Sequence, residues 1–209
     1  MVAKFITVEG TEGVGKSTNI AFIQSLLEAR GIEFCLTREP GGTPLAEEVR
    51  EILLAKRDES FNPTAELLMI FAARAQHIQQ VIKPALDEGK WVISDRFTDA
   101  TYAYQGHGRG LSLETIETLE SLVQRDVQRD VQPDATFILD IDVKVGLERA
   151  SQRGELDRFE IEKLDFFEKV RQGYHARVKQ NPQRYHLIDA GQDLSKVQMD
   201  IKSSMERLF

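Results

Sequence analysis

The sequence predicts an α/β fold in which a five-stranded parallel sheet is flanked by helices. Short apolar runs alternate with longer stretches of helical period along the whole chain. Such alternation of strands and helices favours a mainly parallel sheet. No linker rich in Pro, Gly or Ser divides the 209 residues, so we expect a single domain over residues 1–209.

Five apolar runs are the strand candidates, at residues 5–9, 33–37, 91–95, 136–140 and 185–188. The helical stretches cover residues 16–29, 64–88 for the most part, 113 to about 129, 166–180 and 195–208. One of them contains a tandem repeat, because Val-Gln-Arg-Asp at 123–126 recurs at 127–130. Four residues are close to one helical turn, so the repeat predicts a helix lengthened by about one turn and not a site.

The composition is that of an ordinary globular protein, with 41% hydrophobic and 29% charged residues. The net charge of −7 disfavours binding to a nucleic-acid polymer, which needs a basic face. The single cysteine, Cys35, allows no intrachain disulfide and is predicted to be a strand residue. The first apolar run is too short for a secretory signal, and none approaches the roughly 18 residues of a membrane span. We therefore expect a cytoplasmic protein without a membrane partner.

A glycine-rich turn follows the first predicted strand and opens the first predicted helix. It matches G-x-x-x-x-G-K-[ST] at every fixed position. The residues expected to bind ATP are Gly10, Thr11, Glu12, Gly13, Val14, Gly15, Lys16, Ser17 and Thr18. Glycines let the backbone curl so that its N–H groups face phosphate oxygens, and the helix adds its positive end. We expect Lys16 to contact the β- and γ-phosphates and the Ser17 hydroxyl to face Mg²⁺.

Acidic residues end two of the predicted strands, and either would suit a carboxylate directed at Mg²⁺. They are Asp95 and Asp140, and Asp95 is favoured because Arg96 follows it. The expected cofactor is therefore Mg²⁺, with ATP as co-substrate, held by Ser17 and Asp95 partly through water. The histidines, including His107, show no metal-ligand spacing and are interpreted as loop or surface residues.

Arginines outside the phosphate loop favour a kinase over a nucleotide-dependent switch. We expect Arg38, Arg74 and Arg96 near the carboxyl ends of strands, where open α/β sheets bind ligands and guanidinium forks match phosphate oxygens. The polar segment 149–158 carries three arginines and suits a lid, placed at about 147–160, that closes over the transferred phosphate. Any one arginine alone would fit a surface salt bridge, and the segment a solvated helix end. The guanine-recognition motif N-K-x-D of GTP switches is absent.

Several motifs in order resemble the thymidylate kinase family over nearly the whole chain. They are FITVEGTEG at 5–13, TREPGGT at 37–43, FAAR at 71–74, DRF at 95–97, YAYQG at 102–106 and RGELDR at 153–158, the last similar to a bacterial lid. The resemblance implies phosphorylation of dTMP to dTDP by MgATP, in the synthesis of dTTP for DNA. It also implies a cis bond before Pro40 and a homodimer built from helices.

The resemblance further implies how dTMP is bound. Phe71 would stack on thymine and Arg74 would hydrogen-bond the base. Arg38 and Arg96 would hold the acceptor phosphate. The remaining dTMP-binding residues are Glu12, which would approach the 3′-hydroxyl, and Thr101, Tyr104 and Gln105, which would line the sugar and base pocket.

The residues expected to be catalytic are Lys16, Arg96, Arg153, Arg149 and Glu12. Position 14 is Val, so the phosphate loop has no arginine, as in the bacterial type of the family. Arg149 and Arg153 would then be lid cations over the transferred group. The family has Tyr or His where this chain has Phe97, so any hydrogen bond from that ring is lost.

Three alternatives stay open from the residues. A kinase for another nucleoside monophosphate, such as UMP or CMP, would share most of these motifs. A deoxynucleoside kinase would need a base for the hydroxyl proton, for which Glu12 is the candidate, but its phosphate-binding arginines would lack a purpose. A nucleotide-dependent switch predicts slow turnover without an acceptor and a conformational change that depends on a partner.

Overall fold

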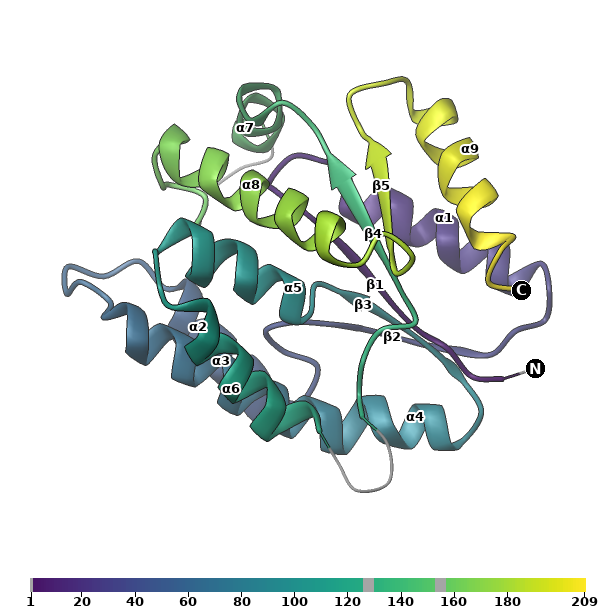
Figure 1. The fold of residues 1–209 in the computed structure, drawn as a ribbon, viewed down its shortest axis with the longest axis horizontal. Coiled ribbons are helices and arrows are strands. Elements are labelled where there is room, and N and C mark those ends of the chain that lie inside the picture. The colour runs from purple at the N-terminus through teal and green to yellow at the C-terminus, as the bar shows by residue number, and fades with distance from the viewer. Residues whose placement is uncertain (1, 126–129, 153–156) are drawn as a thin grey trace.

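The computed structural model describes residues 2–125, 130–152 and 157–209, and its centre is a five-stranded parallel sheet (Figure 1). The strand order is β2-β3-β1-β4-β5, with every neighbouring pair parallel. The strands are β1 (Phe5–Gly10), β2 (Phe34–Arg38), β3 (Trp91–Asp95), β4 (Ala135–Asp140) and β5 (Tyr185–Asp189). The predicted fold class and all five predicted strands are confirmed, and Cys35 lies in β2 as expected.

Helices connect the strands and cover both faces of the sheet. In chain order they are α1 (Lys16–Glu28), α2 (Pro44–Leu54), α3 (Pro63–His77), the π-helical η1 (Ile78–Ile82), α4 (Lys83–Asp87), α5 (Thr98–Thr101), the π-helical η2 (Tyr102–Gly108), α6 (Leu113–Gln124), α7 (Val143–Ser151), α8 (Leu164–Gln180) and α9 (Leu194–Met205). The stretch 64–88, predicted to be mostly helical, is α3, η1 and α4 in sequence. Among the described residues, no helix is both long and apolar enough to cross a membrane.

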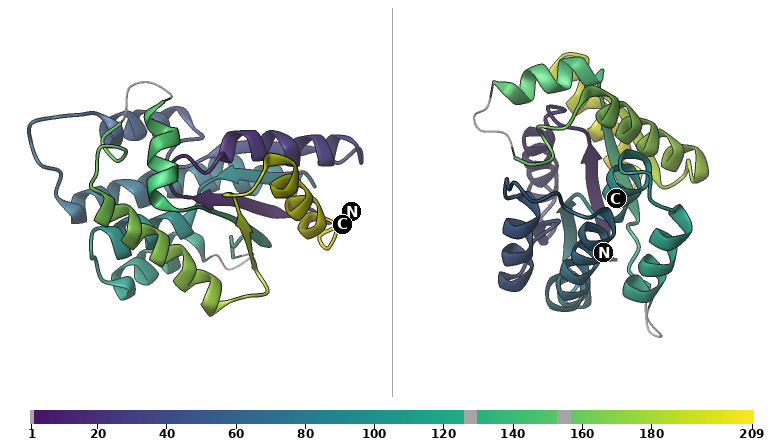
Figure 2. Two further views of the ribbon diagram at one scale, coloured as in Figure 1. Left: turned by 90° about the horizontal axis from the view of Figure 1, so that it is seen from above. Right: turned by 90° about the vertical axis from the view of Figure 1, so that its left-hand side faces the viewer.

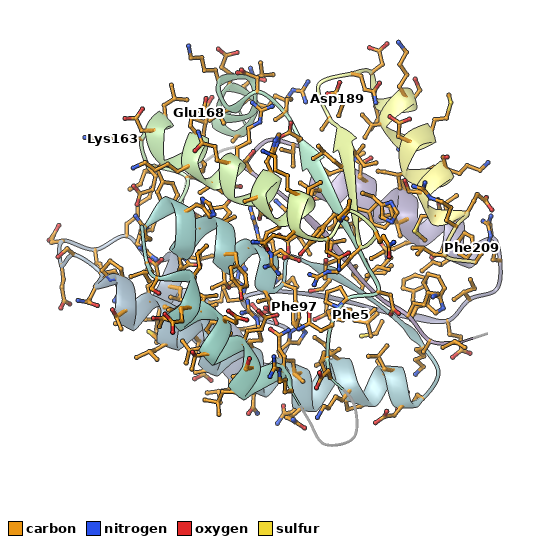
Figure 3. The ribbon with its side chains drawn as sticks, viewed as in Figure 1. Phe5, Phe97, Lys163, Glu168, Asp189 and Phe209 are labelled. Carbon is orange, nitrogen blue, oxygen red and sulfur yellow. The ribbon has the colours of Figure 1, made fainter. Side chains whose placement is uncertain are left out.

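Two apolar layers hold the sheet between its helices. Helices α1 and α9 cover one face, where Ile6 of β1 packs in one cluster with Ile23 and Ile201. The opposite face packs against η1, α4, η2 and α8 (Figure 2). On this side Phe5 meets Phe97 edge to face, with ring centroids 4.9 Å apart (Figure 3). Coverage of both faces explains why the strands are nearly continuous apolar runs in the sequence.

The end of α6 differs from the prediction. The helix stops at Gln124, and Arg125 is already extended, so the predicted extension to about residue 129 is wrong where the structure describes the chain. Residues 126–129 lie outside the described part. The reason is a buried contact, because the Gln124 side chain donates to the Val131 carbonyl at 3.0 Å and the Val131 N–H returns to the Gln124 carbonyl at 2.9 Å. This turn buries Val131 in the cluster around Phe5.

Helices α2 and α7 were not predicted, although both carry capping signals. The Thr43 hydroxyl accepts from the Ala46 N–H, and Pro44 occupies the first helical position. The Asp142 carboxylate likewise accepts from the backbone of Lys144. Such N-caps stabilise a helix by about 1 kcal/mol, and their sequence pattern is a recognised start signal. Both helices begin at the carboxyl edge of the sheet or beside it, where they frame the site.

Candidate active site at the carboxyl edge of the sheet

The phosphate loop joins β1 to α1 and packs closely against α7. Gly13 has φ +73°, and a Cβ atom added there would lie 1.9 Å from the Gly146 carbonyl oxygen. Gly15 adopts the left-handed conformation immediately before α1 begins at Lys16. Gly13 is therefore required because a side chain would clash with α7, and Gly15 because the backbone is left-handed there. Ser17 and Thr18 follow in the first turn of α1 and are exposed.

Strand register brings the predicted charged residues to one edge. Asp95 at the end of β3 is paired with Val8 of β1 and with Arg38 of β2. A cavity opens at this edge. Its predicted polar lining residues are Glu12, Lys16, Arg38, Arg74, Asp95, Arg96, Thr101, Tyr104 and Gln105. Ligands of open parallel sheets bind at this edge, so the cavity is the candidate active site.

Arg96 is the centre of the phosphate end of this cavity. It has φ +70°, a conformation that is uncommon for a residue with a side chain and often marks a functional site. Its guanidinium donates to the Gly10 carbonyl at 2.9 Å, to the Glu12 carboxylate at 2.8 Å and to the Tyr174 hydroxyl at 3.1 Å. Tyr104 also donates its hydroxyl to Glu12, at 2.8 Å. The strand end and the phosphate loop are thus linked directly.

A buried carboxylate supports Arg96 from below. Glu9 accepts from the Phe97 N–H at 2.7 Å and from the Tyr174 hydroxyl at 2.9 Å. Burial, together with the negative charge of Asp99, raises the pKa of Glu9 to about 8. The Phe97 ring makes no hydrogen bond, and instead lies 5.2 Å from the guanidinium of Arg74. The absence of a polar ring here is compensated by cation–π packing.

Lys16 and Asp95 carry opposite charges and line the same cavity. Burial, together with the positive charge of Arg96, lowers the pKa of Lys16, while carboxylates including Asp95 oppose that shift. The Asp95 Oδ1 atom is buried and has no hydrogen-bond partner within the described chain. A buried acceptor without a partner indicates that a hydrogen-bond donor or a cation binds there in the working protein. A carboxylate oxygen is the hard type of ligand that Mg²⁺ prefers, so Asp95 fits a site for this ion.

Asp140, the alternative metal acid, is occupied by other partners. Its carboxylate accepts both Nε and Nη2 of Arg171, at 2.7 and 2.8 Å, and Nε2 of His175 lies 3.0 Å from it. Asp140 is absent from the residues lining the cavity. The preference for Asp95 is therefore supported by the geometry. Across residues 2–125, 130–152 and 157–209 there is no cluster of three His, Cys, Asp or Glu able to hold a metal by itself.

Arg38 lines the cavity in an exposed ion pair. Its Nη2 atom lies 2.8 Å from Glu47 of α2, and the Arg38 side chain is 54% exposed. A second arginine, Arg50, lines the same region and was missed by the sequence analysis. It donates to the Pro40 carbonyl at 2.9 Å, just after the cis Glu39–Pro40 bond that the resemblance led us to expect. The helical start signal at Thr43 and Pro44 would have placed Arg50 on a helix facing this loop.

Arg74 is held in a buried network at the base end of the cavity. Its Nε donates to Glu39 at 2.7 Å and its Nη2 to Thr101 at 2.9 Å, whereas Nη1 is buried with no hydrogen-bond partner in the described chain. Glu39 also contacts Nδ1 of His77 at 2.8 Å. Burial alone would raise the pKa of Glu39, but Arg74 and His77 hold it below its usual value. His77 is fully buried, so its interpretation as a loop or surface residue is wrong.

Phe71 does not reach the cavity. It packs in an apolar cluster with Leu67, Tyr102 and Ile116, and the residue of α3 that lines the cavity beside Arg74 is Ile70. Residues three and four positions before Arg74 both lie close to it on the helix, and the Arg74 guanidinium lies 4.8 Å from the centre of the Phe71 ring. Of the two, Ile70 is the one that lines the cavity. Ile70, one residue before Phe71, is therefore the apolar side chain of α3 that is placed to contact a ligand in the cavity.

The predicted lid is only partly described. Arg149 lies in α7 and donates to the Ala190 carbonyl at 3.3 Å. Arg153 lies outside the described residues. Beyond it, Asp157, Phe159 and Glu160 line the cavity, and the Phe159 ring meets Tyr104 edge to face at 6.0 Å.

A phosphate loop, a strand-end acid with an unpartnered buried oxygen, and arginines at both ends of one cavity are the features of a P-loop nucleotide kinase. The thymidylate kinase family model matches residues 8–201. The chain is 63% identical to the thymidylate kinase of Teredinibacter turnerae over 206 residues, which is 99% of this chain and 98% of that one. It is 57% identical to the thymidylate kinase of Pseudomonas fluorescens, over 100% of this chain and 98% of the relative.

The fold gives the same result. The crystal structure of thymidylate kinase from Ehrlichia chaffeensis superimposes with a TM-score of 0.78 at 36% identity, covering 99% of both chains. The chain belongs to the thymidylate kinase family. Members of this family are kinases that phosphorylate dTMP to dTDP.

Proposed function

We propose that the cavity at the carboxyl edge of the sheet binds dTMP and receives the γ-phosphoryl group of MgATP from the phosphate loop. The kinase activity follows from family membership. The residue roles below are supported by one observation above all: the phosphate loop, the Asp95–Arg96 strand end and the Arg74–Gln105 pair line one cavity. The product would be dTDP, a precursor of dTTP for DNA synthesis, and the expected location in the cytoplasm stays a prediction.

The donor phosphates belong at residues 10–18. Backbone N–H groups of this loop and the N-terminus of α1 offer positive potential to phosphate oxygens. Lys16 of this loop lines the same cavity as Arg96 and adds a compact charge. When bound, Mg²⁺ would neutralise charge on the β- and γ-phosphates, and Ser17 and Asp95 are the residues that would hold it.

The acceptor phosphate belongs at the Arg38 and Arg96 end. The Arg38–Glu47 pair is exposed, and such pairs contribute only about 0–1 kcal/mol, so a phosphate dianion replaces Glu47 at little cost. Glu12 and Tyr104 lie between this end and the base end, where the sugar would pass. Glu12 is already an acceptor of two hydrogen bonds, which suits it to receive a third from the 3′-hydroxyl.

The base belongs at Arg74, Thr101 and Gln105. The orphaned Nη1 of Arg74 would donate to a carbonyl oxygen of thymine. Ile70, in place of the predicted Phe71, would supply an apolar contact to the ring face. This site is formed by residues of α3, α5 and η2.

The chemistry requires no general base. The nucleophile is an oxygen of the dTMP phosphate, whose second pKa is about 6, so it is largely dianionic at neutral pH. Catalysis is then positioning plus neutralisation of charge in the transition state. Lys16 and Arg96 contribute from the described cavity, and Arg149 and Arg153 remain the proposed lid cations within residues 147–160. The whole chain, 1–209, is treated as one catalytic domain.

A homodimer is the proposed assembly. Leu68 of α3 and Leu122 of α6 are 52% and 76% exposed, on two helices that pack against each other. Large exposed apolar side chains on neighbouring helices favour an interface. Light scattering is expected to give the mass of two chains for the protein and of one chain for Leu68→Glu. A monomeric wild type would remove the dimer from the proposal.

The activity is tested by ADP formation from MgATP with and without dTMP. We expect ADP to appear rapidly only when dTMP is present, and Lys16→Ala to abolish it. A slow reaction unaffected by dTMP would instead favour the nucleotide-dependent switch.

A further inference from the structure

Glu66 is a buried carboxylate in α3 to which the proposed function assigns no role. It is 1% exposed, and it lies one turn before Ile70 on the helix that carries Arg74. A buried charge is costly unless compensated, so a residue of this kind has a structural or a functional reason.

The contacts of Glu66 join three separate segments. Its Oε1 accepts from Gln105 Nε2 at 2.7 Å and lies 3.4 Å from Arg109 Nε, while its Oε2 lies 2.7 Å from Arg158 Nη2. Arg158 is itself fixed by donating to the Leu53 carbonyl at 2.7 Å. Two guanidinium groups thus compensate the carboxylate, Arg158 at Oε2 and the more distant Arg109 at Oε1, and the short contact at Oε1 is the one from Gln105.

A carboxylate fixes the orientation of the amide it meets. The Gln105 side chain ends in a donor and an acceptor that are nearly equal in shape, and an ionised carboxylate is only an acceptor. The NH₂ group must therefore face Glu66, and the carbonyl oxygen Oε1 takes the other branch of the amide. No hydrogen bond to this oxygen is found from the described residues, and Gln105 lines the cavity.

Across the cavity, Arg74 presents the opposite polarity. With Nε on Glu39 and Nη2 on Thr101, its remaining Nη1 is a donor without a partner in the described chain. The cavity thus offers one donor and one acceptor. A 4-oxopyrimidine has an acceptor at O4 and a donor at N3–H, which match, whereas a 4-aminopyrimidine has the reverse pattern at both positions.

We propose that Glu66 is a specificity-determining positioning residue: by holding the Gln105 NH₂ group it turns the amide oxygen toward the base and selects oxo over amino pyrimidines. This inference rests on the proposed function, in that Gln105 must lie in the acceptor base pocket. Glu66 itself does not touch the substrate. It acts through the Gln105 side-chain amide: if that amide is reversed, the base meets an NH₂ donor in place of an oxygen acceptor.

Glu66→Gln tests this by changing one acceptor into a donor without a change of shape. Arg158 makes a short charged contact with Oε2 and retains the remaining oxygen, so the new NH₂ group faces Gln105. The Gln105 amide then reverses and shows NH₂ to the base. The matched control is Glu162→Gln, the same change in another partner of Arg109, which Glu162 contacts at 2.5 Å with no contact to Gln105.

The readout is the ratio of dissociation constants for dCMP and dUMP, measured by calorimetry without ATP. These two differ only at the base edge, since neither carries the thymine methyl. We expect the wild type to prefer dUMP, Glu66→Gln to lower the ratio by about tenfold or more, and Glu162→Gln to leave it within about twofold. In a Gln105→Ala background, Glu66→Gln is expected to have no further effect on the ratio.

An unchanged ratio in folded Glu66→Gln would overturn the inference, as would an effect that persists without the Gln105 amide. If Glu66→Gln does not fold, Glu66→Asp retains the charge for both arginines and withdraws the carboxylate from Gln105. A lowered ratio there supports the inference and a wild-type ratio overturns it. Wild-type turnover of dTMP, measured on the same sample, distinguishes this failure from a failure of the proposed function.

Discussion

The two ends of the cavity hold their charged groups in different ways. At the phosphate end, Arg38 pairs with the exposed Glu47, and Arg96 pairs with a Glu12 that also faces the cavity. At the base end, Arg74 and Gln105 are buried, and so are their carboxylate partners Glu39 and Glu66. The phosphate end can exchange its partners for a substrate, whereas the base end presents single, fixed donor and acceptor atoms. Exchangeable ion pairs therefore suit the phosphate end to binding many monophosphates, and fixed hydrogen-bonding atoms suit the base end to selecting one base.

The largest expected effect tests the phosphate end through its proposed lid. Arg153→Ala should lower kcat by about 10³ or more, because a cation over the transferred phosphoryl group acts mainly in the transition state. Arg149→Ala is the comparison, and its effect should be smaller because that side chain already donates to the Ala190 carbonyl. Steady-state kinetics at saturating ATP and dTMP measure both. A loss below about tenfold in Arg153→Ala would exclude it as the lid cation.

The two ends should also differ in how much their arginines contribute to the free energy of unfolding. Arg74→Ala leaves the buried Glu39 without its guanidinium partner, with only the His77 contact remaining, and should cost about 3–5 kcal/mol of the free energy of unfolding. Arg38→Ala breaks an exposed pair and should cost about 0–1 kcal/mol while raising the KM for dTMP. Urea denaturation measures both stabilities. Equal losses would mean that the two ends do not differ as described.

A third pair of variants distinguishes a residue of α3 that lines the cavity from one that packs in the apolar cluster beside it. Ile70→Ala should raise the KM for dTMP, because Ile70 lines the cavity. Phe71→Ala should instead cost about 3–5 kcal/mol of stability, because its ring fills the cluster with Leu67 and Ile116. Kinetics and urea denaturation on each variant provide the test. The assignment of Ile70 fails if Phe71→Ala retains stability but loses affinity for dTMP.

The smallest expected effect is a pH dependence of the stability, caused by the buried Glu9 near Arg96. The pKa of Glu9 is about 8 in the folded protein, above its usual 4.5, so folding retains a proton that the unfolded chain releases. Stability from this group therefore falls as pH rises from about 4.5 to 8. Glu9→Gln removes the titration, and its stability relative to wild type should rise between pH 5 and pH 8. The exposed Glu28→Gln should show no such trend, and a parallel trend in both variants would refute the assignment.

The phosphate end was predictable from the sequence because its signals are local. The spacing of Gly10, Gly15 and Lys16 specifies a loop, and Asp95 with Arg96 directly follows an apolar run. The five strands were predicted for a similar reason, since burial on both faces leaves continuous apolar runs.

The base end depends on contacts between distant positions and was predicted less well. Glu66 meets Gln105 and Arg158 across 39 and 92 residues, and nothing near Glu66 in the sequence indicates these partners. Ile70 was missed because a one-residue error turns a helical side chain by about 100°. The end of α6 was missed because a buried turn at Gln124 overrides the local repeat.

One end of the cavity should bind the phosphate of any nucleoside monophosphate, while the other end should select thymine. The direct test is kcat/KM for ADP formation with dTMP, dUMP, dCMP, AMP and GMP as acceptors under MgATP. We expect the highest kcat/KM for dTMP, a lower one for dUMP and values near zero for dCMP, AMP and GMP. A preference for dCMP or a purine would contradict the assigned roles of Arg74 and Gln105, although the phosphate end would stand.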